Sequence, residues 1–163
     1  MSFGGELNTI LVATDGSPSA QEACTFAREL AFAHDAALIF VHVVRTHDFA
    51  ASHIDEPGYA VPHEPTEQDH AVLAEEATRA ADRGVRATSS LRHGSAIDEI
   101  VTHAETCDAD LIIVGTKGHG RMVNAVIGSV SLGVLHRATC PVLIVRGAHA
   151  TRSTNPSQAK TSA

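Results

Sequence analysis

The sequence lacks the features that identify membrane, secreted and disulfide-rich proteins. No apolar run approaches the ~20 residues of a membrane-spanning helix, and the first residues form neither the basic nor the apolar part of a signal peptide. The 3 cysteines form no CxxC pair, which is typical of a reduced protein rather than of a disulfide scaffold. We therefore expect a cytoplasmic protein without a membrane partner.

Basic charge is also scarce. The 12 lysines and arginines are outnumbered by 19 aspartates and glutamates, which gives a formal net charge of −7. A protein that binds nucleic acid needs a basic face for the phosphate backbone, so this balance argues against a nucleic-acid partner. The 11 histidines form neither an HxH nor an HExxH pattern, and we expect no metal site built from side chains.

Apolar segments alternate along the chain with segments of helical periodicity. The segments expected to be strands are Thr9–Thr14, Ala37–Val44, Val85–Arg92, Leu111–Val114 and Val142–Val145. The helices expected between them begin after Ser17, Thr66, Ser95 and Gly128. This alternation predicts a single doubly wound α/β domain over residues 1–147, with a five-stranded parallel sheet and helices on both faces. Residues 148–163 are small and polar and are expected to form a flexible tail.

Two glycine-containing turns follow the fourth expected strand. The run Gly115-Thr116-Lys117-Gly118-His119-Gly120 comes directly after the strand, and Gly128-Ser129 comes directly before a helix. Glycine lets the backbone approach a ligand, and a helix N-terminus offers unpaired N–H groups and a positive dipole end. The pattern predicts a nucleotide-phosphate site, with purely structural turns as the alternative. It matches neither the P-loop pattern nor the dinucleotide fingerprint GxGxxG.

Asp15, at the end of the first expected strand, would join this site under one strand order. Periodicity does not give the order of strands, but in the order 3-2-1-4-5 the first and fourth strands flank the crevice where ligands bind. Asp15 could instead hydrogen-bond within its own turn. Ser129 could be only an N-cap, although capping and phosphate binding use the same helix end.

Several segments together resemble the universal stress protein family. They are the opening ILVATDGS, the strand IFVHVV, the ending CPVLIVR and the spacing Gly115-x2-Gly118-x9-Gly128-Ser129. The resemblance covers nearly the whole chain apart from the Thr46–Pro65 loop and the tail. It implies an adenine nucleotide alpha hydrolase-like fold with the strand order 3-2-1-4-5, ATP binding in members that keep the glycines, and frequent homodimers.

The resemblance also implies which residues contact the nucleotide. Ala13 and Asp15 would lie beside the adenosine, and Val43 would help hold the base. Val114 and Gly115 would contact the ribose. The residues that would meet the phosphates are Lys117, Gly118, Gly128, Ser129, Val130 and Ser131.

Two hypotheses for function follow from the motif and the resemblance. The first is a regulatory protein without catalytic residues that binds ATP with Mg²⁺ and changes its assembly or its partners during stress. The second is a slow ATPase or a phosphotransferase, in which Lys117 and Arg121 would stabilise charge at the γ-phosphate. Residues 115–131 contain no aspartate, glutamate or glutamine to position a water molecule, which favours binding over turnover. A dimerisation module that has lost nucleotide binding is a third possibility.

The last expected strand, Val142–Val145, is apolar and contains no charged or proline residue. An edge strand without such a guard pairs readily with another copy of itself. We therefore expect a two-fold homodimer through this strand. The long Thr46–Pro65 loop could be a lid or part of the dimer surface.

Overall fold

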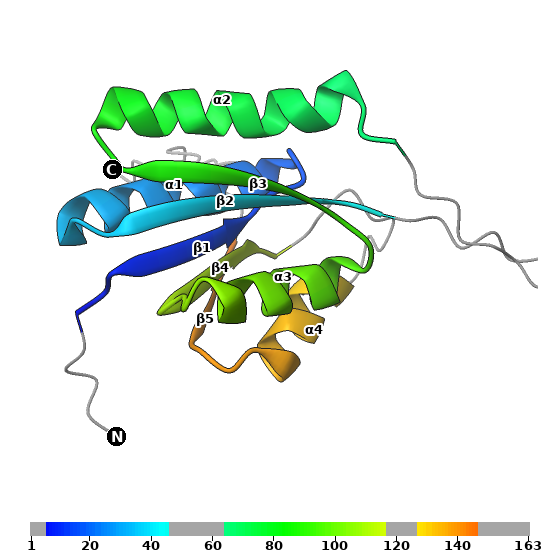
Figure 1. Ribbon diagram of the computed structural model, residues 1–163. Helices are drawn as coiled ribbons and strands as arrows, with labels where there is room; N and C mark the ends of the chain where they lie inside the picture. Colours follow the sequence, from blue (N-terminus) through cyan, green and yellow to red (C-terminus); the bar gives the residue numbers. More distant parts are fainter. Residues whose placement is uncertain (1–5, 46–63, 117–126, 147–163) are drawn as a thin grey trace, which may run out of the picture.

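The structure, a computed structural model, describes residues 6–45, 64–116 and 127–146. Strands and helices alternate along these residues (Figure 1). In chain order they are β1 (Thr9–Ala13), α1 (Pro18–His34), β2 (Ala37–Val44), α2 (Glu67–Arg83), β3 (Ala87–His93), α3 (Ala96–Thr106), β4 (Leu111–Gly115), α4 (Ser129–Arg137) and β5 (Val142–Val145). The tail expected over residues 148–163 lies outside the described residues.

The strands form one parallel sheet in the order β3-β2-β1-β4-β5. This order confirms the doubly wound α/β fold that the sequence predicted. In the centre of the sheet, Ile10 of β1 is paired with Leu38 of β2 on one side and with Leu111 of β4 on the other. The chain thus winds in opposite directions from β1. The crevice at the carboxyl ends of β1 and β4 is therefore the place where a ligand is expected.

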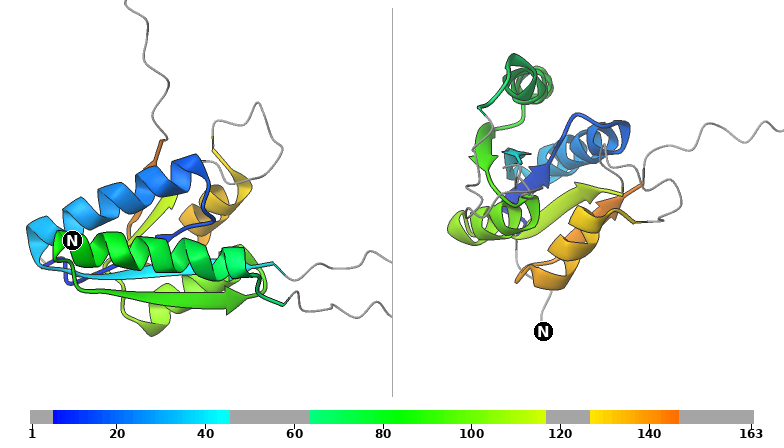
Figure 2. Two further views of the ribbon diagram at one scale, coloured as in Figure 1. Left: turned by 90° about the horizontal axis from the view of Figure 1, so that it is seen from above. Right: turned by 90° about the vertical axis from the view of Figure 1, so that its right-hand side faces the viewer.

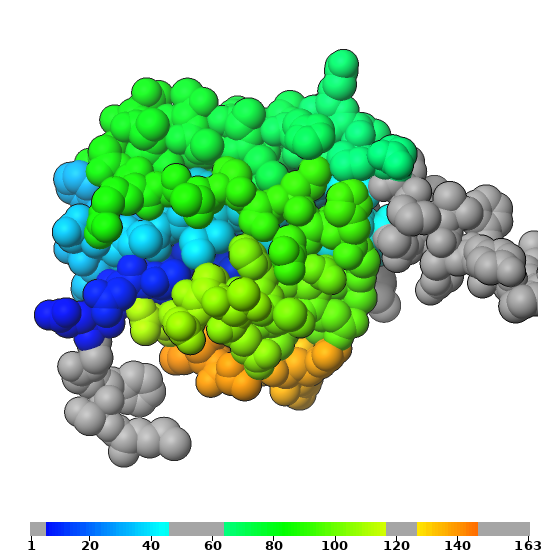
Figure 3. Space-filling model, viewed as in Figure 1, coloured from blue at the N-terminus to red at the C-terminus, as the bar shows by residue number. Residues whose placement is uncertain are grey.

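Helices cover both faces of the sheet. Helices α1 and α2 pack on the face to which Phe40 and Ile113 point, and α3 and α4 pack on the face to which Val41 and Ile112 point (Figures 1 and 2). Successive side chains of a strand point to opposite faces, so each inner strand contributes to both cores. A strand buried on both sides has to be almost continuously apolar, which explains the unbroken apolar runs of β1 and β4. In the space-filling view, α2 and β3 form the upper part of the visible face, and α3, α4 and β5 form the lower part (Figure 3).

The helices begin and end at the capping residues that the sequence contains. The Ser17 side chain caps α1 by accepting a hydrogen bond from the backbone of Ala20. Thr66 and Asp69 form a capping box at the start of α2. Gly84 ends α2 in the left-handed conformation, with φ of 77°, which glycine adopts at little cost. These boundaries confirm the expected helices.

The alternating pattern predicted that the third strand begins at Val85. In the structure it begins two residues later, at Ala87. The N–H of Val85 donates to the carbonyl of Ala80 at 2.9 Å, a bond that closes α2 instead of joining the sheet. The Val85 side chain is buried in the core beneath α2. Its apolar character therefore reflects packing in a turn. The strand itself lies at an edge of the sheet, as expected.

Candidate functional site

The turn after β1 places Asp15 at the carboxyl edge of the sheet. The N–H of Thr14 donates to the carbonyl of Val41 at 2.9 Å, which ties the end of β1 to β2. Oδ1 of Asp15 accepts a hydrogen bond from the N–H of Ser17 at 3.0 Å, so the side chain has the turn-forming role that was its alternative interpretation. This bond orients the carboxylate at the edge of the crevice. Its contact with adenosine stays a prediction.

The two glycine turns are adjacent at their described ends. The N–H of Thr116 donates to the carbonyl of Val145 at 2.9 Å, and this bond extends the pairing of β4 with β5. The N–H of Gly128 donates to the carbonyl of Thr116 at 2.5 Å. The Ser131 hydroxyl donates to the carbonyl of Gly115 at 2.6 Å. Helix α4 thus begins directly against the carboxyl end of β4. This is the arrangement that a shared phosphate site requires.

The middle of the glycine-rich segment, residues 117–126, lies outside the described residues. It includes Lys117 and Gly118, for which phosphate contacts were predicted, and Arg121, the second cation of the phosphotransfer hypothesis. Those contacts stay predictions. The residues that the structure does bring together are the end of β4 and the first turn of α4.

The first turn of α4 has the donors that a phosphate needs. Its N-cap is Gly128, and no side chain caps the helix, in contrast to the hydroxyl caps of α1, α2 and α3. The first N–H groups of a helix have no partner within the helix, and the first helical bond here is from Leu132 to the Gly128 carbonyl. The N–H groups of Ser129, Val130 and Ser131 therefore precede the helical ladder. They fit an anion held at the positive end of the helix dipole.

The other predicted contacts form an apolar border on the same face of the sheet. Ala13, Val43 and Val130 are partly buried and pack against one core cluster, together with Ile97 of α3. Such a surface suits the flat apolar faces of a purine base. Val114 is only 3% exposed in the same core, so a ribose contact from this residue would come from its main chain.

Gly115 has a structural role that the sequence did not reveal. A Cβ atom at this position would lie 2.7 Å from the carbonyl carbon and oxygen of Ser19. Glycine is therefore needed for α1 to pack against the end of β4. The predicted ribose contact is compatible with this role but does not explain the residue by itself.

A buried histidine beside the crevice was also missed by sequence reasoning. His42 of β2 is 7% exposed, and its ring nitrogens lie 2.7 Å from the Thr14 carbonyl and 2.7 Å from Oδ1 of Asp69. The capping box indicated Asp69, but no spacing signal connects it to a residue 27 positions earlier. Among the described residues, no group of three or more His, Cys, Asp or Glu side chains could hold a metal ion.

A family model described as the universal stress protein family matches residues 6–146. The chain belongs to this family. It is 34% identical over 146 residues to universal stress protein YxiE of Bacillus subtilis, with 85% of this chain and 99% of the relative covered. These comparisons confirm the resemblance on which the candidate site was built.

Solved structures of universal stress proteins share the fold. A family member from Burkholderia pseudomallei is 30% identical, has a TM-score of 0.64, and is matched over 87% of this chain and 98% of its own. A universal stress protein solved in complex with cAMP is 28% identical, has a TM-score of 0.67, and is matched over 88% of this chain and 100% of its own. The second structure shows an adenine nucleotide bound to a relative of this universal stress protein.

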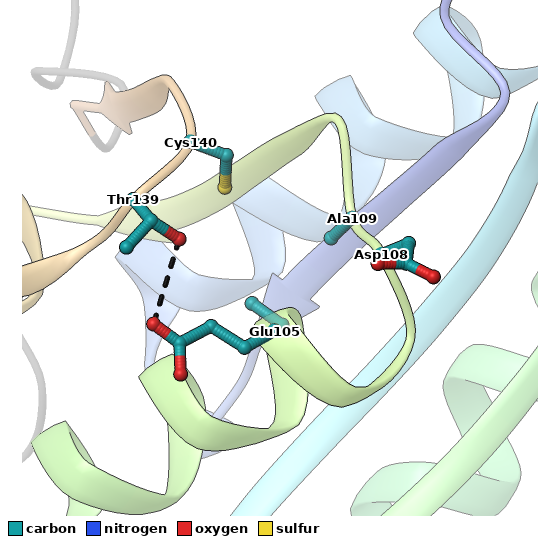
Figure 4. A pocket seen from close by; sticks show the side chains of 6 residues that line it. Glu105, Asp108, Ala109, Thr139 and Cys140 are labelled. Carbon is teal, nitrogen blue, oxygen red and sulfur yellow. Dashed lines mark hydrogen bonds between the residues drawn. The ribbon is translucent and has the colours of Figure 1, made fainter.

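A separate pocket lies at the opposite end of the sheet, before β4 and β5. It is lined by Ala104, Glu105, Asp108, Ala109, Thr139 and Cys140 (Figure 4). The Thr139 hydroxyl donates to Glu105 at 3.5 Å, and this bond joins α3 to the segment before β5. Ligands of doubly wound sheets bind at the carboxyl ends of the strands, so the pocket is on the wrong edge for the nucleotide.

No helix within the described part of the chain is long and apolar enough to cross a membrane.

Proposed function

We propose that this universal stress protein binds ATP together with Mg²⁺ and acts as a nucleotide-dependent regulator in the stress response. The observation that carries the proposal is the start of α4, which lacks a side-chain cap and is hydrogen-bonded through Gly128 to the residue after β4. The family's glycine spacing is complete in the sequence. Mg²⁺ would be held mainly by phosphate oxygens and water, as is usual for this ion.

The chemistry of the crevice supports an adenine nucleotide in particular. Val43 and Ala13 provide apolar contacts for the base, and the α4 N-terminus offers N–H groups for the phosphates. The net charge of −7 repels a polyphosphate, so the binding free energy has to come from local donors. The relative that binds cAMP supports the adenine part of the proposal.

Binding without rapid turnover is the form of the proposal that the residues favour. Hydrolysis needs a side chain that positions water, and residues 115–131 contain no carboxylate or glutamine. A bound nucleotide can act as a regulatory signal by binding one conformation or assembly more tightly than another. Incubation with ATP followed by product analysis separates the two functions, because many turnovers per site within minutes would favour the ATPase.

Calorimetric titration with ATP and Mg²⁺ tests the proposed site. We expect the wild type to bind and Gly128→Asp to bind at least about tenfold more weakly, because the new carboxylate repels phosphate and caps the same N–H groups. Gly128→Asn adds a cap without the charge, so its affinity should be intermediate. Ser95→Asp places the same charge at the N-cap of α3, and this control should bind like the wild type.

Each outcome of this titration decides one part of the proposal. Equal affinity of Gly128→Asp and the wild type would show that the phosphates do not lie at α4. A wild type that binds no adenine nucleotide would contradict the proposed function and leave the dimerisation module as the remaining interpretation.

We also propose that the protein is a cytoplasmic homodimer that pairs through β5. Strand β5 is the last strand of the sheet, and its four residues are all partly exposed. Leu132 and Leu135 of α4 add exposed apolar surface, at 43% and 45% exposure. The cytoplasmic location is supported by Cys24, Cys107 and Cys140, which are free thiols.

A further inference from the structure

An ion pair lies beside the residue that is predicted to hold the base. Arg92 of β3 is paired in register with Val43 of β2, and each is the last residue but one of its strand. Residues in register on neighbouring parallel strands point to the same face of the sheet. This is the α3 face, since Val43 packs against the core beneath α3 and Nε of Arg92 donates to Oε2 of Glu99 on α3 at 3.1 Å. Arg92 therefore borders the Val43 position at the carboxyl edge of the sheet.

The guanidinium group of Arg92 has donors left for a ligand. Its side chain is 36% exposed, and the bond to Glu99 uses Nε. The two terminal nitrogens have no hydrogen-bond partner among the described residues. An exposed ion pair contributes little to stability by itself. An arginine held through Nε does, however, keep a planar set of donors in a fixed direction, which suits the acceptors of a bound ligand.

Glu99 is held at the end of β2, on which the base is expected to lie. The segment after β3 turns back into α3 (Figure 1), and there the N–H of Gly94 donates to the carbonyl of Val44 at 3.0 Å. Gly94 has φ of 133°, a conformation that favours glycine, and a Cβ atom added to it would lie 3.5 Å from Oε1 of Glu99. Glu99 is also in the first turn of α3, where the helix dipole stabilises a carboxylate. Its carboxylate is thus a fixed support for Arg92.

The position of Arg92 separates it from the phosphates. The strand order places β2 and β1 between β3 and β4, so at about 4.8 Å per strand β3 lies about 14 Å from β4. The N–H groups proposed for the phosphates are at the start of α4, directly beside the end of β4. A donor on β3 is therefore at the base end of the site. N3 and N7 of adenine accept hydrogen bonds, so they match the donors of an arginine.

We infer that Arg92 is a base-contacting residue of the nucleotide site, where it donates to ring nitrogens of adenine, and that Glu99 is the positioning residue that holds its guanidinium in the required direction. The inference rests on the proposed function. It adds that the site recognises the nucleoside itself, so adenosine without any phosphate gains as much from Arg92 as ATP does.

The test compares three ligands that share the base and differ in their phosphates. Adenosine, AMP, and ATP with Mg²⁺ are titrated by calorimetry into the wild type and into Arg92→Met, and weak binding of adenosine is measured by its displacement of ATP. Methionine keeps an unbranched side chain and removes the donors. We expect Arg92→Met to bind all three ligands about tenfold more weakly, the equivalent of one hydrogen bond to a charged group.

The matched control is Arg86→Met, which makes the same change of net charge at the other end of β3. Arg86 precedes β3 at the amino edge of the sheet, where it lies 3.7 Å from Asp35 in an ion pair and is 69% exposed. Its effect on ATP binding measures the long-range contribution of one positive charge. The informative quantity is therefore the ratio of the dissociation constants of the two variants, which we expect to be about ten for each ligand.

Two further variants test the direction of the guanidinium. Arg92→Lys keeps the positive charge but loses the planar donors, so it should not restore adenosine binding. Glu99→Met should weaken adenosine binding by about fivefold when Arg92 is present. It should have no further effect in Arg92→Met, because Glu99 acts through Arg92. Equal effects of Glu99→Met in both backgrounds would contradict its positioning role.

The ligand series distinguishes failure of the inference from failure of the proposed function. If Arg92→Met binds adenosine like the wild type, Arg92 does not contact the base and the inference is overturned, whatever the effect on ATP. A wild type that binds ATP but no adenosine up to its solubility limit would overturn it as well. In both cases the proposed function stands. A wild type that binds no adenine nucleotide would contradict the proposed function, and this inference with it.

A second measurement uses the wild type alone and does not depend on the folding of a variant. The Nε–H signals of arginine side chains in nuclear magnetic resonance spectra report changes around each guanidinium. We expect adenosine alone to shift the signal of Arg92 and to leave that of Arg86 unchanged. An Arg92 signal that moves only when ATP is added, or does not move at all, would overturn the inference.

Discussion

A Cβ atom added to Gly115 would lie 2.7 Å from the carbonyl carbon and oxygen of Ser19. The end of β4 and the first turn of α1 therefore approach each other more closely than any side chain would allow. These two atoms belong to the main chain, which cannot rotate aside as the Ser19 hydroxyl, at 2.8 Å, can. The candidate nucleotide site thus shares one of its predicted residues with the packing of the domain.

We expect Gly115→Ala to lower the free energy of unfolding by about 1–3 kcal/mol in the absence of nucleotide, because α1 has to shift away from the sheet. Urea denaturation of the nucleotide-free protein measures this effect. The comparison variant is Gly133→Ala in α4, where the added Cβ meets Cδ1 and Cγ1 of the Ile97 side chain instead of main-chain atoms, and where alanine improves helix propensity by about 1 kcal/mol. Gly133→Ala should cost less stability than Gly115→Ala, because the Ile97 side chain can move aside and the gain in helix propensity offsets part of the cost. Equal stability of Gly115→Ala and the wild type would show that Gly115 is needed only for the ligand.

The buried ion pair between Arg28 and Glu76 leads to a second prediction. Both residues are nearly buried between α1 and α2, and Glu76 also accepts a hydrogen bond from Arg79 at 2.9 Å. Removing one partner leaves a charge in the interior, so we expect Arg28→Met to destabilise the fold by about 3 kcal/mol. The double variant Arg28→Met with Glu76→Leu should regain much of this loss, since it leaves no buried charge between the two helices.

Urea denaturation of the two variants and of a surface control checks this prediction. Glu29→Gln weakens the bidentate ion pair with Arg83, in which the side chains are 58% and 40% exposed. This change should cost much less stability than Arg28→Met, because solvent screens exposed charges. A double variant that is less stable than Arg28→Met would show that the charges themselves stabilise the packing of α1 on α2.

The predictable features of this fold are local, and the unpredictable ones join residues far apart in the chain. Ser17, Thr66 and Gly84 act on their own helix ends, so the sequence indicated where α1 and α2 begin and where α2 ends. The strand order followed from the family resemblance, because periodicity carries no information on which strands are neighbours. The predicted start of β3 at Val85 was wrong, because a residue buried in a turn and a residue buried in a strand give the same apolar pattern.

The same distinction applies to the candidate site. The glycine spacing indicated which segments form it, and the structure places Gly115 and Gly128 on either side of one hydrogen-bonded junction. The close approach of Ser19 to Gly115 and the bond from His42 to Asp69 depend on how separate elements pack. Such contacts leave no periodic signal in a single sequence.

The hydrogen bonds that lower the pKa of Asp69 predict a loss of stability in acid. They come first from the Thr66 hydroxyl and N–H, and then from His42. A carboxyl group whose pKa is lower in the folded state stabilises the fold at pH values above its unfolded pKa, which is ordinarily 3.8. This contribution disappears as the pH falls through the folded value, when the unfolded chain has already taken up its proton.

We therefore expect the wild type to lose more stability than Asp69→Asn between about pH 5 and pH 2. Urea denaturation at a series of pH values measures both slopes. Asp82→Asn changes an exposed carboxylate on the same helix and should keep the wild-type slope. If Asp69→Asn loses stability in acid as steeply as the wild type, other carboxylates account for the acid sensitivity.

The proposed dimer depends on backbone groups at the free side of β5. The N–H of Ile112 donates to the carbonyl of Pro141, and the N–H of Thr116 donates to the carbonyl of Val145. The carbonyls of Pro141 and Val145 therefore face β4. Because backbone groups alternate along a strand, the N–H of Ile144 points to the open side. Proline at this position removes the N–H from the dimer edge and leaves the β4 ladder in place.

We expect the wild type to sediment at micromolar concentration with twice the 17.1 kDa mass of one chain, and Ile144→Pro to sediment as a monomer. Ser89→Pro makes the same change at the other edge of the sheet. The N–H of Leu38 donates to the carbonyl of Arg86, so the Arg86 carbonyl faces β2 and the Ser89 N–H points to the open side of β3. This control should remain a dimer, because the proposed contact lies at β5. A wild type that sediments as a monomer would rule out the dimer. Dissociation of Ser89→Pro together with a dimeric Ile144→Pro would place the contact at β3 instead.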